Sequence, residues 1–199
     1  MTPKETREQF AQAYVDKLCG VFKALPFADI ARALEVLERA YQQNHQVFLA
    51  GNGGSSATAS HMANDLMKGI VLPGKRGLRA ISLSDNVPLM TAVANDIGYA
   101  EIFARPLAEL GQSGDVLIVI SASGNSPNVL RAIETAKQKG ITTVGFLGMG
   151  GGKASKMVDV PVVVPADDYG PVEDAHMMFD HLTMAYMRAW LARPDALPA

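Results

Sequence analysis

Two kinds of apolar pattern alternate along the chain. In the N-terminal part, apolar residues recur at helical spacing on both sides of Pro26, which predicts helices over residues 4–23 and 28–41. Short continuous apolar runs follow at residues 47–50 and 116–120, and such runs are typical of buried strands. By the same patterns, we expect three more strands at 79–83, 142–147 and 160–164, and further helices at 56–68, 87–110, 128–139 and 172–191. Strands that alternate with helices predict an α/β fold, a three-layer α/β/α sandwich around a parallel sheet.

The composition fits a single folded domain. The chain has 199 residues, of which 48% are hydrophobic, and this is enough apolar material for one sizeable core. Glycine and proline are dispersed along the chain and form no linker. We therefore expect one domain over residues 1–199, made of a helical segment at 3–43, a doubly wound core at 44–191 and a short tail at 192–199.

The charge and the cysteine content narrow the function classes. The formal net charge is -2, which argues against the broad positive surface that nucleic-acid binding requires. No uncharged apolar run is long enough to cross a bilayer. The single cysteine, Cys19, cannot form an internal disulfide, and the first residues lack the basic and then apolar pattern of a secretion signal. We expect a cytoplasmic protein that binds neither nucleic acid nor membrane.

Two loops rich in glycine and serine follow two of the apolar runs. The first reads Gly-Asn-Gly-Gly-Ser-Ser at 51–56, and the second reads Ser-Ala-Ser-Gly-Asn-Ser at 121–126, with Pro127 able to open the next helix. Loops at the carboxyl ends of parallel strands bind ligands, and the helix N-termini that follow them attract anions. One such loop alone could equally be a turn in which serine caps a helix. Because there are two, the sequence favours a phosphate site.

Nucleotide-binding motifs offer an alternative interpretation of the glycine-rich stretches. The first loop begins like a dinucleotide fingerprint, but Ser56 stands where the third glycine belongs, and the acidic partner is missing at the required distance. The stretch at 148–154 resembles a nucleotide P-loop, but Leu147 replaces its first glycine and Ala154 cannot ligate magnesium. We therefore interpret that stretch as a flexible turn.

Two segments carry candidates for acid, base or metal chemistry. His61 and Asp65 are four residues apart on one predicted helix, so their side chains share a face close to the first loop. They could transfer a proton, hold a divalent metal or form an ordinary surface pair. The last predicted helix is dense in titratable residues: Glu173, Asp174, His176, Asp180 and His181. Spacing does not decide which of the two histidines belongs to a site.

Three motifs occur in the order and spacing of a known family. They are Ala-Gly-Asn-Gly-Gly-Ser at 50–55, Asn-Asp-Ile-Gly-Tyr at 95–99 and the serine loop at 121–126. Together they resemble the successive signatures of the phosphoheptose isomerases, and the resemblance extends from the leading helices to about Trp190. It implies the SIS fold, with a five-stranded parallel sheet, and a homotetramer with active sites between subunits. Taken alone, Asn95 and Asp96 indicate no more than a helix end.

The resemblance also implies a reaction and residue roles. The family interconverts sedoheptulose 7-phosphate and D-glycero-D-manno-heptose 7-phosphate by proton transfer through an enediol, for surface polysaccharides such as lipopolysaccharide. Asp65 would be the base and His181 its partner acid. Zinc or another divalent metal would be held by His61, Asp65, Glu173 and His181. The residues implied to contact the sugar phosphate are Asn52, Gly53, Gly54, Ser55, Asn95, Asp96, Ser121, Ala122, Ser123, Ser126 and Glu173.

Three positions depart from the family pattern. Asp65 stands where the family has glutamate, Glu173 where glutamine is typical, and Ala122 where a hydroxyl residue is usual. The carboxylate of Asp65 is retracted by one methylene, and Glu173 would make the metal site more anionic. Two alternative functions follow: a non-catalytic SIS adaptor that binds the replication initiator DnaA, or an isomerase of another ketose phosphate. The cluster of histidines and carboxylates favours an enzyme over an adaptor.

Overall fold

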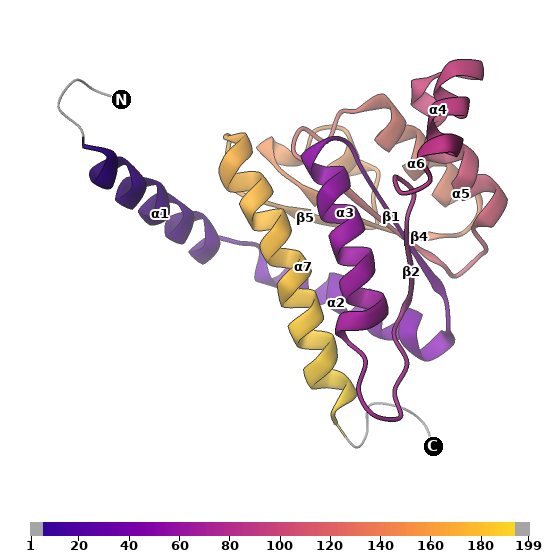
Figure 1. Ribbon diagram of the computed structural model, residues 1–199, viewed down its shortest axis with the longest axis horizontal. Coiled ribbons are helices and arrows are strands. Elements are labelled where there is room, and N and C mark those ends of the chain that lie inside the picture. The colour runs from indigo at the N-terminus through magenta and orange to yellow at the C-terminus, as the bar shows by residue number, and fades with distance from the viewer. Residues whose placement is uncertain (1–5, 194–199) are drawn as a thin grey trace.

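The computed structural model describes residues 6–193 (Figure 1). Its strands are β1 (Gln46–Gly51), β2 (Arg79–Ser82), β3 (Val116–Ser121), β4 (Thr142–Leu147) and β5 (Val160–Val163). Its α-helices are α1 (Arg7–Lys23), α2 (Phe27–Gln43), α3 (Gly54–Asn64), α4 (Val87–Asp96), α5 (Ala104–Leu110), α6 (Pro127–Gln138) and α7 (Tyr169–Leu191). A π-helical turn at Asp65–Gly69 continues α3, and short 3-10 turns lie at Tyr99–Glu101, Met149–Gly151 and Ala154–Lys156.

The five strands form one parallel sheet in the order β2-β1-β3-β4-β5. In the central pair, Val47 of β1 lies opposite Val116 of β3, and Gly51 lies opposite Ile120. The predicted α/β fold with a five-stranded parallel sheet is therefore confirmed. The strand order reverses between β1 and β3, so the loops after these two strands diverge and leave a crevice at the carboxyl edge of the sheet.

Helices cover both faces of the sheet, because successive residues of a strand point to opposite sides. Val47 and Leu49 of β1 belong to a core shared with α2, α3 and α7, whereas Phe48 and Ala50 pack with α4, α5 and α6. All four side chains are at most 1% exposed. Burial on both faces explains why β1 is a continuous apolar run in the sequence instead of an alternating one.

The helix expected over 87–110 is broken, and this prediction was wrong. α4 ends at Asp96, and the chain passes through Gly98 with a φ of 137° before α5 begins at Ala104. Glycine adopts this backbone angle readily, and other residues rarely do. At the N-terminus, α1 begins at Arg7, and the hydroxyl of Thr6 accepts the Gln9 N–H at 3.2 Å as an N-cap. Lys4, where the first helix was expected to begin, and positions 194–199 of the expected tail lie outside the described residues.

α1 projects away from the rest of the molecule (Figure 1), and none of its residues is buried. Phe10 on this helix is 51% exposed. Two polar contacts tie α1 to the beginning of α7: the Tyr14 hydroxyl donates to Asp174 at 2.6 Å, and Lys17 forms an ion pair with Asp168 at 2.8 Å. α1 therefore presents apolar side chains, such as Phe10, that residues 6–193 of this chain leave uncovered.

α7 is the longest helix within residues 6–193 and lies beside α3 on one face of the sheet (Figure 1). Its buried side includes Phe179, whose ring packs 5.1 Å from that of Phe146 on β4. Near its end, Trp190 meets Tyr41 of α2 edge to face, with ring centroids 5.8 Å apart. None of the helices in the described part of the chain combines the length and the apolarity that a membrane crossing needs.

Candidate active site

The two glycine and serine loops lie side by side at the crevice of the sheet. β1 ends at Gly51 and β3 ends at Ser121, and these strands are the neighbours between which the strand order reverses. The first loop leads into α3 and the second into α6, so the positive ends of two helix dipoles lie at the same edge. The fold therefore gathers the features from which the sequence predicts a phosphate site.

A polar pocket of about 140 Å³ opens between these loops and the first turns of α7. The residues that line it are Asn52, Ser55, Ile120, Ser121, Ala122, Ser123, Ser126, Tyr169 and Glu173. Most of the residues that the resemblance implies for sugar-phosphate binding are thus brought together in one chain. Gly53 and Gly54 stand in the turn between Asn52 and Ser55, where the backbone enters α3.

The serine hydroxyls of the second loop keep hydrogen atoms available for an anion. Ser121 accepts the backbone N–H of Gly124 at 3.1 Å, and Ser123 accepts that of Asn125 at 3.3 Å. A hydroxyl that accepts a hydrogen bond can still donate its own proton. Ser126 precedes α6 but its side chain makes no capping hydrogen bond. The alternative in which serine serves as a helix cap therefore does not apply at Ser126.

A pair of amides fixes one wall of the pocket. Asn52 and Asn128 exchange two side-chain hydrogen bonds, of 2.9 and 2.8 Å, and Asn128 is fully buried. The Asn128 carbonyl also accepts the N–H of Val129 at 3.0 Å, and the Tyr99 hydroxyl donates to the Asn52 carbonyl at 3.0 Å. These contacts determine which way the Asn52 amide faces.

Neither Asn128 nor Tyr169 was among the residues that the sequence singled out, because no motif distinguished them from ordinary residues of a helix start.

The stretch at 148–154 is a turn, as expected, but it is anchored and not free. The Asn125 side chain donates to the Ser123 carbonyl at 2.9 Å and accepts the Lys153 N–H at 3.1 Å. The Ala154 N–H also donates to the carbonyl of Gly124 at 2.9 Å. This turn is therefore hydrogen-bonded to the serine loop and helps to hold it in place.

α3 and α7 run in parallel away from the pocket and face each other at matching positions. At the pocket end, the Glu173 carboxylate approaches Gly54 so closely that an added Cβ would lie 3.1 Å from it. Seven residues further along each helix, His61 Nδ1 lies 3.8 Å from Asp180 Oδ2. Seven residues make about two helical turns, which returns each helix to nearly the same face. We call this line of contact the α3–α7 seam.

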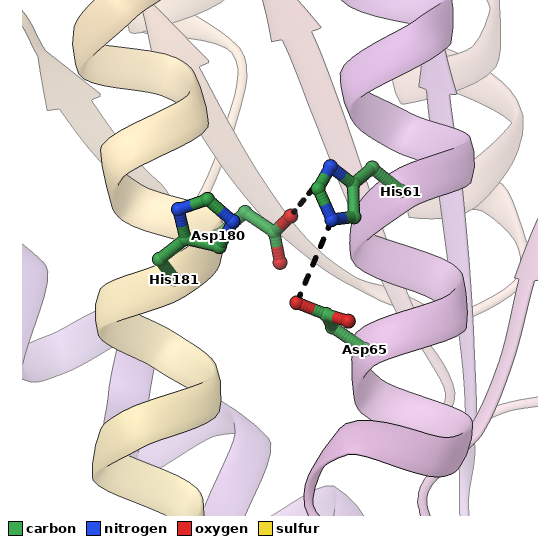
Figure 2. A group of neighbouring side chains, drawn as sticks. All are labelled: His61, Asp65, Asp180 and His181. Carbon is green, nitrogen blue, oxygen red and sulfur yellow. Dashed lines mark ion pairs between the residues drawn. The ribbon is translucent and has the colours of Figure 1, made fainter.

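Four titratable side chains converge at the second of these seam positions, as Figure 2 shows. His61 comes from α3 and Asp65 from the π-helical turn that continues it, while Asp180 and His181 come from α7. One ligand atom from each of the four lies within 4.8 Å of the others. His61 has a carboxylate at 3.8 Å from each ring nitrogen, Asp65 on one side and Asp180 on the other. We call these four residues the His/Asp cluster.

Burial perturbs two groups on the inner side of α7. Asp180 is 1% exposed, and neither of its oxygens has a hydrogen-bond partner within the described residues. Burial and then the nearby charge of Asp65 raise the pKa of Asp180 to about 6. His176 is also 1% exposed, neither of its ring nitrogens has a hydrogen-bond partner in the part of the chain that the structure describes, and burial lowers its pKa to about 4. His176 is therefore a neutral side chain in the core and lies outside the cluster.

The structure places some of the residues that the resemblance implied elsewhere than expected. Glu173, expected among the metal ligands, is not in the His/Asp cluster and lines the pocket instead. Asp180, which the sequence offered only as one of several acidic residues, occupies that fourth place. Asn95 and Asp96 are exposed at the end of α4, bonded to each other at 2.7 Å, and do not line the pocket of their own chain. Spacing along α7 could not reveal which of its faces meets α3.

Comparison with known proteins decides the family. The SIS domain model matches residues 9–148 of the chain. A phosphoheptose isomerase from Clostridium acetobutylicum is 41% identical over 153 residues, which make up 77% of this chain and 78% of that protein. The chain belongs to the phosphoheptose isomerase family.

The fold agrees with this phosphoheptose isomerase assignment. A phosphoheptose isomerase structure from Francisella tularensis superposes with a TM-score of 0.86 at 28% identity, covering 93% of this chain and all of that one. A second phosphoheptose isomerase, from Neisseria gonorrhoeae, gives a TM-score of 0.82 at 26% identity, with 92% of this chain and all of that one covered.

Proposed function

We propose that this chain interconverts sedoheptulose 7-phosphate and D-glycero-D-manno-heptose 7-phosphate. The observation that carries the proposal is the separation between the pocket and the His/Asp cluster along the α3–α7 seam. Gly54 and His61 are seven residues apart on α3, or about 10 Å at the helical rise. In an extended heptose 7-phosphate eight bonds separate C1 from phosphorus, roughly 10 Å at the advance per bond of an extended chain. A seven-carbon sugar phosphate therefore matches the axial length between the pocket end of α3 and the cluster, whereas a pentose phosphate is two bonds shorter.

Asp65 and His181 are the residues we assign to proton transfer. The isomerisation removes a proton from C1 of the ketose and returns one to C2, while a hydroxyl proton moves from O1 to O2. Asp65, as a carboxylate, takes and returns the carbon-bound proton, and His181 exchanges the proton on oxygen. Both belong to the His/Asp cluster, which places their ligand atoms within 4.8 Å of one another. That spacing suits two groups that act on adjacent carbons.

A divalent metal, zinc in our proposal, fits the donor set of the cluster. Two imidazoles and carboxylate oxygens are ligands that zinc takes in proteins. His61, Asp65 and His181 are both implied by the family resemblance and present in the cluster, and we assign them to hold the ion. When bound, such an ion polarises the sugar carbonyl and stabilises the negative charge that develops on oxygen. The chain's own groups supply the proton transfers described above.

The pocket residues divide the remaining recognition between phosphate and sugar. The hydroxyls of Ser121, Ser123 and Ser126 and the two helix N-termini bind the phosphate. Glu173 is a carboxylate, so it is repelled by a phosphate and accepts hydrogen bonds from sugar hydroxyls instead. Asn52, held by its amide pair, donates to the same ligand. This division explains why an acidic side chain is tolerated in a site for an anion.

We further propose that the protein assembles as a homotetramer with active sites between subunits. The family resemblance suggests this assembly, and the uncovered apolar side chains of α1, including Phe10, support it because they need a partner surface. Asn95 and Asp96, which do not line the pocket of their own chain, would then serve a neighbouring one. Cytoplasmic localisation and a role in lipopolysaccharide synthesis remain part of the same proposal, and the exposed thiol of Cys19 is compatible with a reducing compartment.

The proposal is tested by an isomerisation assay with sedoheptulose 7-phosphate. The aldose product is followed by NMR in deuterium oxide, on chelator-treated and zinc-loaded protein. Asp65→Asn and His181→Ala should each lower kcat by at least about 100-fold, which is the scale of general acid–base catalysis. A matched variant away from the site, His45→Ala before β1, should keep full activity. Deuterium at C2 of the product is the signature of proton transfer through an enediol.

Different outcomes separate the alternatives. Turnover of fructose 6-phosphate or a pentulose phosphate in preference to sedoheptulose 7-phosphate would contradict the seven-carbon assignment and favour another ketose phosphate. Binding of sugar phosphates without turnover of any of them would contradict the enzyme and favour the adaptor role. Turnover that survives both Asp65→Asn and His181→Ala would show that the proton is moved by other groups.

A further inference from the structure

Asp180 is a buried carboxylate for which the fold supplies no partner. It is 1% exposed, and neither oxygen accepts a hydrogen bond from any described residue. The nearest cationic candidate is His61, whose Nδ1 is 3.8 Å from Asp180 Oδ2, which is too long for a hydrogen bond. Buried carboxylates in folded proteins are almost always paired, hydrogen-bonded or bound to a metal. An unpartnered one therefore points to a position that can bind a cation.

The surroundings of Asp180 match what a cation needs. Figure 2 shows its carboxylate directed into the space between α3 and α7, toward His61 and Asp65, with His181 alongside. The ligand atoms of all four residues lie within 4.8 Å of one another. Ligands of a tetrahedral zinc ion stand about 3.3 Å apart, so the 3.8 Å separations need only small side-chain movements to close.

Glu173, the carboxylate that the family resemblance places in this role, is directed to another part of the α3–α7 seam in this structure. It stands seven residues before Asp180 on α7, which is about 10 Å along the helix axis. Its carboxylate oxygens lie against Gly54, at 3.1 and 3.2 Å from the position of an added Cβ, and it lines the serine-loop pocket. The two carboxylates therefore lie at different positions along the α3–α7 seam.

We propose that Asp180 supplies an oxygen ligand to the divalent cation of the His/Asp cluster in the place of Glu173, which is left to contact the sugar. This inference rests on the proposed isomerase function and concerns the same site. The ligand set is then His61, Asp65, Asp180 and His181, all from one chain. Two carboxylates and two neutral imidazoles balance the charge of a divalent ion, which makes the buried position of Asp180 electrostatically acceptable. With this ligand set, Glu173 does not bind the metal and remains available at the pocket.

The test uses cobalt(II) as a visible substitute for zinc, and a thiol as a reporter of direct coordination. In a Cys19→Ser background, which removes the single native thiol, Asp180→Cys and Glu173→Cys are prepared as a matched pair. A thiolate bound to cobalt(II) gives an intense near-ultraviolet charge-transfer band, and a thiol that does not touch the metal gives none. Asp180→Asn and Glu173→Gln form a second pair, for which the cobalt(II) affinity is measured by calorimetry. Circular dichroism and gel filtration check that each variant is folded.

We expect the charge-transfer band in Asp180→Cys and none in Glu173→Cys. We expect Asp180→Asn to weaken cobalt(II) binding by more than about 100-fold, because the loss of a group that only orients a ligand costs up to about that much. We expect Glu173→Gln to change the cobalt(II) affinity by less than about threefold. A band in Glu173→Cys, or none in a folded Asp180→Cys, overturns the proposal. If Asp180→Cys does not fold, the affinities decide: a loss of 100-fold or less in Asp180→Asn, or a comparable loss in Glu173→Gln, overturns it.

The unmodified protein separates this inference from the function on which it rests. Absence of cobalt(II) binding in a protein that still isomerises sedoheptulose 7-phosphate overturns the ligand assignment and leaves the isomerase in place. Cobalt(II) binding through position 180 in a protein that isomerises none of the ketose phosphates contradicts the proposed function and supports the ligand assignment.

Discussion

Replacement of His176 by leucine should stabilise the protein, and the gain should grow as the pH falls. Within the described residues neither nitrogen of this buried imidazole makes a well-formed hydrogen bond, although the Leu147 backbone weakly favours its charged form, and a buried polar side chain left unsatisfied costs about 1–3 kcal/mol. A leucine of similar size removes that cost, so His176→Leu should raise the free energy of unfolding by about 1–3 kcal/mol at pH 7. Because His176 lies outside the His/Asp cluster, isomerase activity should be unchanged at this pH.

The pH dependence follows from the lowered pKa of His176. Burial brings this pKa from 6.5 to about 4, so the folded protein binds the proton more weakly than the unfolded chain does. The native protein therefore loses stability as the pH falls below 6.5, by about 3 kcal/mol once it reaches 4. His176→Leu has no such loss, so the difference between the two proteins should widen by that amount between pH 7 and pH 4.

Urea unfolding at a series of pH values measures this difference directly. The comparison cancels the acid titration of carboxylates that both proteins share. His45→Leu serves as the control, because His45 is partly exposed and 3.7 Å from Asp115, and its loss should give no stabilisation at pH 7. A difference between His176→Leu and the native protein that stays constant with pH would refute the reasoning, as would a destabilised variant at neutral pH.

Three further perturbations act on other parts of the structure. Gly124→Ala puts a Cβ 2.0 Å from the backbone carbonyl oxygen of Gly151 at a φ of 60°, so thermal denaturation should show that the free energy of unfolding falls by at least about 3 kcal/mol. Gly20→Ala, which has open space around its Cβ, should show no loss of stability. Asn128→Ala frees the Asn52 amide and should raise the KM for sedoheptulose 7-phosphate about 10-fold with kcat little changed; an unaltered KM in steady-state kinetics would contradict this. In metal-free protein, the raised pKa of Asp180 means that the folded state holds this proton more tightly than the unfolded chain does. The free energy of unfolding should therefore fall by up to about 3 kcal/mol as the pH rises from 3.8 to above 6. In chelator-containing buffer, Asp180→Asn should abolish that fall.

The strands and loops could be predicted from the sequence because their signals are local. The apolar run before Gly51 and the one before Ser121 have strand length, and each ends in residues that favour tight turns. The break at Gly98 was missed because the apolar residues after it continue at helical spacing. Periodicity reports which residues are buried, and it does not report whether the backbone between them stays helical.

The candidate site was only partly predictable, because its membership depends on how two helices face each other. His61 and Asp65 could be paired from their four-residue spacing on one predicted helix. Among the acidic residues of α7, the choice between Glu173 and Asp180 depends on the axial position of α7 against α3, which no local pattern encodes. The one sequence signal was the presence of Asp180 within an apolar helix, where a charged side chain needs a partner.

The heptad register of the α3–α7 seam also limits how this protein can change during evolution. Inserting one residue between Glu173 and Asp180 would turn everything after it by about 100° around the helix axis and carry Asp180 away from His61. The length of this segment is therefore fixed even where its residues are free to vary. Homologous sequences should show substitutions between these positions but no insertions or deletions, and length variation should gather in segments such as 70–78, outside the helices that carry the site.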